Sequence, residues 1–310
     1  MVGMSISSAE AYNGVDLGIS MNNRVIGLFL LVLPSLFGQV IPSNGDQVST
    51  ANQLYHSTDY QASLTLLRET GQTSGEAYSL MGRDYFMLSD YKKATEAFTK
   101  AFTLEPSNSE FALWLGRAFG RRAEVASPFL APAYASKARS YFEKAVALDP
   151  KNEEALNDLF DYYLEAPGFL GGGYEKAQVI AKRIAQRNPA EGHFAEAQLA
   201  EKRRQFDTAE EQLRRAMELA PRQVGRVLDL ARYLAKHGRI SESEATFDKA
   251  EQLAPNSPKI RFARARTYIE QKRNLAQAKM LLEQYLHSDL TPDDPPREQA
   301  RKLLKHLSGA

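Results

Sequence analysis

The chain has 310 residues, of which 43% are hydrophobic and 25% charged, and its formal net charge is +1. This is an ordinary soluble globular composition, long enough for one extended array or two domains. The near-zero net charge argues against bulk attraction to nucleic acid or to an acidic membrane surface. Cysteine is absent, which excludes disulfides, thiolate chemistry and cysteine-ligated zinc.

The N-terminal region predicts an export signal. Residues 1–20 have no strong hydrophobic period, and we expect them to be disordered or to precede a true start at Met21. Arg24 then precedes an apolar run at 25–38 that is too short to span a bilayer. This pattern is typical of a bacterial secretory signal peptide over residues 21–38, and it predicts a periplasmic or otherwise extracytoplasmic protein. The alternatives are a retained anchor or a helix buried against the first repeat.

After a polar linker at 39–45, an internal repeat dominates the chain. The stretch 89–106 reads SDYKKATEAFTKAFTLEP, with small and apolar residues at the i, i+3, i+4, i+7 spacing of an amphipathic helix. A proline ends it, and similar stretches end at Pro150, Pro189, Pro221 and Pro255. One helical pair cannot bury its apolar face alone, so neighbouring pairs must stack. The pattern therefore predicts an all-α fold built from repeated helix pairs.

These repeats resemble the tetratricopeptide repeat (TPR) family, whose helix pairs carry small and aromatic residues at fixed positions. In residues 75–106 those positions hold Tyr78, Met81, Gly82, Tyr85, Ala94, Phe98, Ala101 and Pro106. Residues 109–150 and 224–255 are similar, whereas the helix at 192–204 has no clean register and Arg264 replaces an apolar residue. The resemblance implies a right-handed superhelical solenoid of antiparallel helix pairs, with about six or seven repeats over 46–290.

The C-terminal residues 291–310 predict a linker and a capping helix. Three prolines break the preceding helix, and an apolar stripe of Ala300, Leu303, Leu304 and Leu307 follows, opposite basic residues. Such a helix would cover the open face of the last repeat. The alternative is a free amphipathic helix that binds a membrane surface.

Two repeats are longer than the others, with additions around 124–134 and 166–173 between their first and second helices. Stacking should place both additions on the same edge of the solenoid. Their apolar residues are Phe129, Leu130, Phe169 and Leu170. We interpret them either as longer turns that tuck into local grooves or as an apolar edge where a partner docks.

No catalytic or metal-binding constellation is present in the sequence, which predicts neither an enzyme nor a cofactor. The histidines are His56, His193, His237, His287 and His306, and no two of them have metal-ligand spacing. No Gly-x-Ser-x-Gly elbow occurs, and the paired acids sit at helix starts or in a linker.

Arginine recurs at one repeat position that faces the concave groove in TPR arrays. The residue after the central small residue is Arg83, Arg117, Arg232 or Arg266, and Arg121 and Lys236 follow one turn later on the same face. Trp114, the only tryptophan, is either a groove contact or part of the core. Guanidinium groups bind carboxylates in a bidentate manner, so these residues predict a basic, partly aromatic groove for an acidic or carboxylate-ended segment. The alternative is a solvated basic face.

The sequence thus favours a non-enzymatic scaffold or adaptor of the bacterial cell envelope, whose partner is another protein or peptide rather than a nucleic acid. Contact with a membrane would be transient, through the signal segment. The alternatives are a structural spacer in an envelope assembly and an enzyme whose site the sequence does not reveal.

Overall fold

The structure, a computed structural model, describes residues 44–71 and 73–308. Within them it contains fifteen α-helices, one 3-10 helix and no strand. The helices are α1 (Asn44–His56), α2 (Tyr60–Glu69), α3 (Gly75–Met87), α4 (Tyr91–Leu104), α5 (Ser109–Val125), α6 (Ala131–Leu148), α7 (Glu153–Glu165), η1 (Gly168–Leu170), α8 (Tyr174–Arg187), α9 (Pro189–Lys202), α10 (Phe206–Leu219), α11 (Val224–Lys236), α12 (Ile240–Leu253), α13 (Pro258–Glu270), α14 (Leu275–Leu286) and α15 (Arg297–Ser308). The predicted signal peptide at 21–38 and the stretch 1–20 lie outside the described residues.

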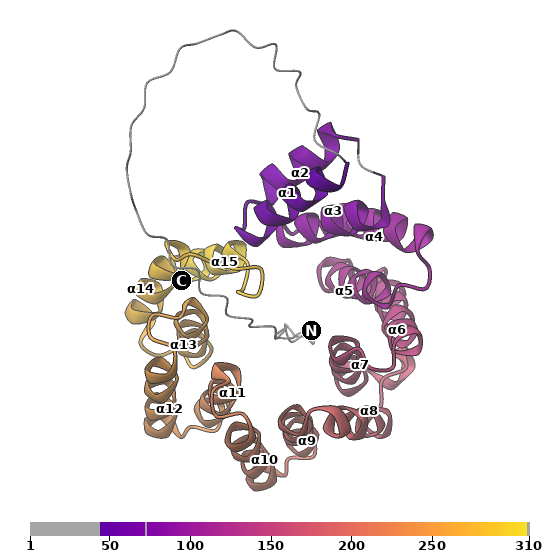
Figure 1. Ribbon diagram of the computed structural model, residues 1–310. Helices are drawn as coiled ribbons and strands as arrows, with labels where there is room; N and C mark the ends of the chain where they lie inside the picture. Colours follow the sequence, from indigo (N-terminus) through magenta and orange to yellow (C-terminus); the bar gives the residue numbers. More distant parts are fainter. Residues whose placement is uncertain (1–43, 72, 309–310) are drawn as a thin grey trace, which may run out of the picture.

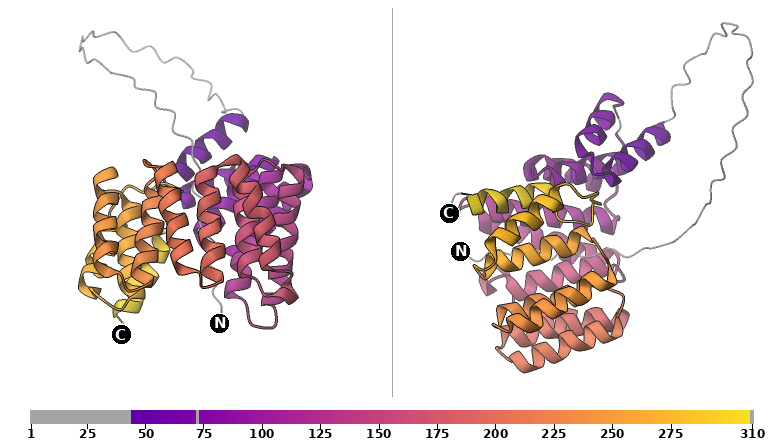
Figure 2. Two further views of the ribbon diagram at one scale, coloured as in Figure 1. Left: turned by 90° about the horizontal axis from the view of Figure 1, so that it is seen from below. Right: turned by 90° about the vertical axis from the view of Figure 1, so that its left-hand side faces the viewer.

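The helices form seven antiparallel pairs, α1/α2 to α13/α14, and α15 follows the last pair. Each pair packs on the next, and the array curves until its two ends lie side by side (Figure 1). The odd-numbered helices from α3 to α13 line the inside of the curve, which we call the inner face, and their partners lie outside (Figures 1 and 2). The predicted all-α solenoid is confirmed, and seven pairs fall within the expected number.

Asparagine caps set the register of three successive inner helices. The side chain of Asn108 accepts hydrogen bonds from the amides of Glu110 and Phe111 at the start of α5. Asn152 caps α7 and Asn188 caps α9 in the same way. Each cap satisfies an amide that the first turn leaves without a partner, so the helix begins at a defined residue.

Small residues let the two helices of a pair approach closely. A Cβ atom added at Gly82 would lie 2.6 Å from the ring of Phe98, and one added at Gly116 would lie 2.7 Å from the ring of Phe142. Both rings are almost fully buried. Alanines recur at two positions of the outer helices: Ala94 and Ala177 lie twelve residues before the closing proline, and Ala145 and Ala250 lie five residues before it. All four are 0% exposed. Small residues at these repeat positions therefore mark where one helix packs closely against its neighbour.

The last helix covers the end of the array, as predicted. Ala300 is fully buried, and three leucines of α15 pack on a cluster that contains Tyr268, Leu282 and Tyr285. The apolar stripe of α15 thus packs on the last repeat and does not form a free amphipathic helix. The capping function is confirmed.

The two additions differ from each other in structure. The first is largely helical, because α5 and α6 have 17 and 18 residues where α3 and α4 have 13 and 14. Only residues 126–130 connect them. The second is a true loop containing η1, where Gly171 adopts φ +87°, a conformation that glycine accepts without a steric penalty.

Candidate partner-binding face

Four arginines share one position on the inner face. Arg83, Arg117, Arg232 and Arg266 each lie nine residues after the N-cap of their helix, in α3, α5, α11 and α13. The structure therefore supports the shared register on which the predicted basic groove depends. The four arginines differ, however, in how deeply they are buried and in which side chains they contact.

Arg83 is the arginine whose charge is least compensated. Its guanidinium lies 5.7 Å from the ring centroid of Tyr55 and 5.9 Å from that of Trp114, which are cation–π distances. The nearest carboxylate is that of Glu110, 3.7 Å away and itself half exposed. The buried Nε atom of Arg83 has no hydrogen-bond partner, and a quarter of the side chain is exposed. The guanidinium is thus flanked by two aromatic rings and remains partly accessible.

Trp114 is both packed and accessible. Its ring stacks on Phe98 at 5.7 Å with an interplanar angle of 19°, and the edge of Phe86 meets it at 5.6 Å. The ring is only partly buried, and it lies against Arg83 as well as against Arg117, whose guanidinium is 4.9 Å away. The two sequence interpretations are thus combined: one part of the indole belongs to the core and the other to the inner face.

Arg117 differs from Arg83, since it is buried and paired. Its Nε lies 2.5 Å from Asp158 and its Nη1 lies 2.9 Å from Glu154, and both carboxylates belong to the next inner helix, α7. Burial raises the pKa of the Asp158 carboxyl, and the Arg117 guanidinium opposes that rise. Removing one member would leave a buried charge without its partner, which costs about 3–5 kcal/mol. Arg117 therefore stabilises the stacking of two repeats.

The other predicted cations also contact carboxylates of the chain itself. Arg232 pairs with Asp229, Lys236 with Glu201 at 2.6 Å, Arg266 with Glu270 at 2.7 Å, and Arg121 with Glu124. Arg121 also donates to the hydroxyl of Tyr91 at 3.1 Å. The pairs of Lys236 and Arg266 are the more exposed of these, so each stabilises little. Asp229 and Glu124 are largely buried.

Several residues of the inner face were missed in the sequence. Tyr55 supplies a ring to Arg83, and Glu154 and Asp158 compensate Arg117. In α9 and α11, Arg226 lies 4.2 Å from the ring of Phe194 and 3.4 Å from Glu191. The sequence signal that could have found them is the capping asparagine before each inner helix. Counting residues from Asn152 and Asn188 gives the helical positions that face inward, which the apolar pattern of α9 does not reveal.

The edge residues lie at the two additions, as the sequence placed them. Phe129 is 94% exposed and Phe169 is 81% exposed, while Leu130 is about half exposed. Leu170 instead packs against the core, and its carbonyl accepts hydrogen bonds from Tyr162 and Arg139. Two phenylalanine side chains are thus free to contact another molecule, and Leu170 fixes the loop that carries one of them.

Neither a metal site nor a membrane span is found in the part of the chain that the structure describes. No group of three or more His, Asp or Glu side chains among these residues could hold a metal ion. None of the described helices has the length and apolar character needed to cross a bilayer.

Comparisons with known proteins agree with this architecture. The family model of the tetratricopeptide repeat matches residues 194–258 and 228–295. A TPR protein from Parabacteroides merdae has a TM-score of 0.55 and 14% identity, and the match covers 86% of this chain and 99% of that one. A thermophilic TPR protein from Thermus thermophilus has a TM-score of 0.51 and 22% identity, covering 62% and 99%. None of the curated proteins compared with the sequence matches it.

The family model and the two structures together support a tetratricopeptide-repeat array. Because the two structures are only 14% and 22% identical to this chain, they show similarity of fold alone. Proteins built from such repeats generally bind other proteins or peptides through extended concave surfaces. They are generally scaffolds rather than catalysts.

Proposed function

We propose that this protein is a non-catalytic scaffold that holds a segment of another protein against its inner face. The observation that carries the proposal is the arrangement of Arg83 between Tyr55 and Trp114. Aromatic rings on two helices orient this guanidinium, and its nearest carboxylate is at 3.7 Å, beyond hydrogen-bond distance. A carboxylate from a partner can approach more closely and accept two parallel hydrogen bonds.

The partner segment is acidic or ends in a free carboxylate. Lys236 and Arg266 extend the contact along the inner face, because their pairs are partly exposed and an incoming anion can replace the internal one. Arg232 is about half exposed beside buried Asp229 and adds positive charge to the same face. Arg121 lies against the ring of Tyr91 and stays paired with Glu124. Arg117 stays with Asp158 and supports the surface on which the segment lies.

The test replaces Arg83 with glutamate and compares it with Arg68→Glu, an exposed arginine of the outer helix α2. Proteins retained from a bacterial envelope extract by the wild-type chain are identified, and the bound segment of each is titrated against all three chains. A charge-assisted hydrogen bond contributes roughly 1.5–3 kcal/mol, so Arg83→Glu should weaken binding at least about tenfold. Arg68→Glu should bind as the wild type does. Equal affinity of Arg83→Glu and wild type would refute the assignment.

A passive spacer in an envelope assembly is the rival function, and Trp114 distinguishes the two. It is the only tryptophan of the chain, so emission excited selectively at tryptophan reports on this one site of the inner face. A segment bound beside Arg83 should change the emission of Trp114 during the same titration. A spacer that contacts its neighbours elsewhere should leave the emission unchanged.

We also propose that the protein is exported and works in the bacterial cell envelope. The support is the cationic start and apolar run of residues 21–38, followed by a small residue, Gly38. N-terminal sequencing of the protein recovered from the periplasm should give a mature end near Gln39. Recovery with an intact N-terminus at Met1 or Met21 would contradict cleavage.

A further inference from the structure

The two ends of the array meet through a single arginine. Arg297, the first residue of α15, donates from Nη1 to the hydroxyl of Thr58 in the turn between α1 and α2, at 2.7 Å. The residues are 239 positions apart. Both Figure 1 and Figure 2 show α15 beside the first helices. In an open solenoid a repeat contacts only its neighbours, so this contact is additional to the repeat pattern.

The remaining donors of Arg297 hold the end of α14. Nη2 donates to the carbonyl of Ser288 at 2.9 Å, and Nε lies 3.5 Å from that of Leu286. The last carbonyls of a helix have no partner within the helix, so a guanidinium is well suited to this position. Arg297 therefore binds both ends of the array at once.

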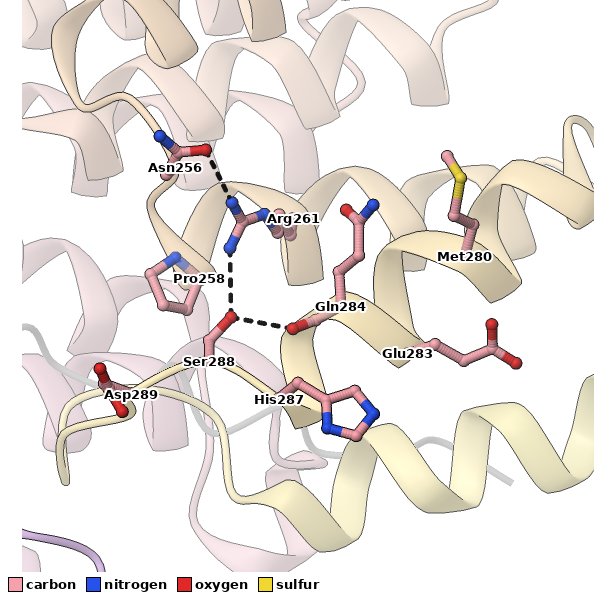
Figure 3. Close-up of a pocket in the computed structure, with 9 residues that line it drawn as sticks. All are labelled: Asn256, Pro258, Arg261, Met280, Glu283, Gln284, His287, Ser288 and Asp289. Carbon is pink, nitrogen blue, oxygen red and sulfur yellow. Dashed lines mark hydrogen bonds between the residues drawn. The ribbon is translucent and has the colours of Figure 1, made fainter.

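Arg261 of α13 fixes the other side of Ser288. Its Nη1 donates to the Ser288 hydroxyl at 3.1 Å and its Nη2 to Asn256 at 3.0 Å. The same hydroxyl donates to the carbonyl of Gln284 at 2.9 Å (Figure 3). A continuous chain of hydrogen bonds thus runs from α13 through Ser288 and Arg297 to the first hairpin.

The linker between α14 and α15 is held in one conformation. The Tyr285 hydroxyl donates to the carbonyl of Pro295, and Asp294 accepts from both the amide and the hydroxyl of Thr291, at 2.9 and 3.1 Å. On the opposite side, Thr58 has φ +60°, which is uncommon for a β-branched residue. The linker and the turn are therefore both preformed, and little freedom is lost when they meet.

We propose that the contact of Arg297 with Thr58 is a latch that closes the solenoid into a ring. The stacked pairs are held by apolar interfaces, whereas Arg297 donates a charge-assisted hydrogen bond across this junction. Other polar groups of the two ends also face one another there, among them Asp293 with Tyr55 and His56. Because polar contacts join these two ends, we expect the ring to open at this junction. Closing it fixes the width of the inner face, and opening it lets the two ends separate.

Paired labels measure the closure without any partner protein. The chain has no cysteine, so Gln53→Cys on α1 and Lys302→Cys on α15, both exposed, can carry spin labels specifically. With native Arg297 the distance distribution should be short and narrow. Arg297→Ala should shift it to longer, broader distances, and so should Thr58→Val, which removes only the acceptor across the junction. Arg301→Ala, on the same helix, is the matched control and should change nothing.

The other outcomes overturn the proposal. Unchanged distributions in both Arg297→Ala and Thr58→Val would show that the arginine does not hold the ends together. A broad distribution in the chain with native Arg297 would show an open array. A short distance seen only when two singly labelled chains are mixed would place the contact between copies. Circular dichroism of each variant verifies that the helices are intact, and Thr58→Val covers the case in which Arg297→Ala unfolds the last repeat.

Discussion

At the scale of single residues, arginines that occupy the same repeat position in the sequence differ in burial in the structure. Arg83 and Arg117 occupy the same repeat position and contact the same tryptophan. One keeps its outer edge accessible, while the other is 8% exposed and bound to two carboxylates. We propose that Arg83 contacts the partner segment, while Arg117 stabilises the inner face beside it. The difference arises from α7, whose Asp158 reaches Arg117 from 41 positions further along the chain.

Asp84 is a buried acid whose protonation is expected to link stability to pH. It is 0% exposed on α3, where Ser63 donates to it at 2.7 Å. Burial raises the pKa of Asp84 to about 8, and the Ser63 hydrogen bond and the Arg83 charge only partly oppose this. The native state therefore holds a proton that the unfolded chain releases at lower pH. The stability from this group is lost as pH rises toward 8, by about 1.4 kcal/mol per unit in the steepest range.

Asp84→Asn should remove that dependence while keeping an acceptor for Ser63. The free energy of unfolding, measured with denaturant from pH 5 to pH 9, should favour the variant increasingly as pH rises and then level off above pH 8. Ser63→Ala should extend the loss to higher pH, because the hydroxyl favours the charged form and its removal raises the pKa of Asp84 further. A constant difference between Asp84→Asn and the native chain at every pH would contradict the assignment.

At the scale of elements, the two additions show how similar sequence insertions take different forms. The first extends both helices of its pair by about a turn and leaves a five-residue connection at 126–130, whereas the second becomes a loop around η1. Three consecutive glycines prevent the second from continuing as helix, since glycine loses more freedom in a helix than other residues do. Both nevertheless expose a phenylalanine.

Replacing Phe129 and Phe169 together with alanine tests whether these edges bind the partner. Both side chains are more than 80% exposed, so the free energy of unfolding should change by less than about 0.5 kcal/mol. Affinity for the captured segment should fall if the partner reaches the edge. Val179→Ala, an exposed apolar residue of α8, serves as the control. A large loss of stability instead would mean that the phenylalanines support the turns.

At the scale of the whole molecule, the array must cover its last repeat. Deleting residues 299–310 removes the leucines of α15 while leaving Arg297 in place. The exposed cluster around Leu282 and Tyr285 should lower the free energy of unfolding of the last pairs by roughly 3 kcal/mol and favour association between copies. Thermal melting and light scattering measure both effects. Reversing the charge of exposed Arg301 should change neither. A monomeric truncated chain with unchanged melting would show that α15 is not needed as a cap.

Much of the architecture could be predicted from the sequence, because it depends on local spacing. Pro106 and its equivalents mark where helices end, and Gly82 and Gly116 mark where they touch. In a repeat array each helix pair packs mainly on its neighbours, so its packing is defined by its own residue pattern and that of the adjacent pair. The same periodicity predicted the shared position of the four arginines and the capping stripe of α15.

The charges on the inner face and the closure of the array were decided only by the tertiary structure. Two contacts depend on how the stacked pairs rotate relative to one another. They are the pairing of Arg117 with Asp158 and the contact of Arg297 with Thr58. That rotation accumulates over seven pairs, so a small change in each would separate the ends completely. Spacing along the chain determines how a repeat packs on its neighbour. The contact between the first and the last repeat depends instead on the total rotation accumulated over all the pairs between them.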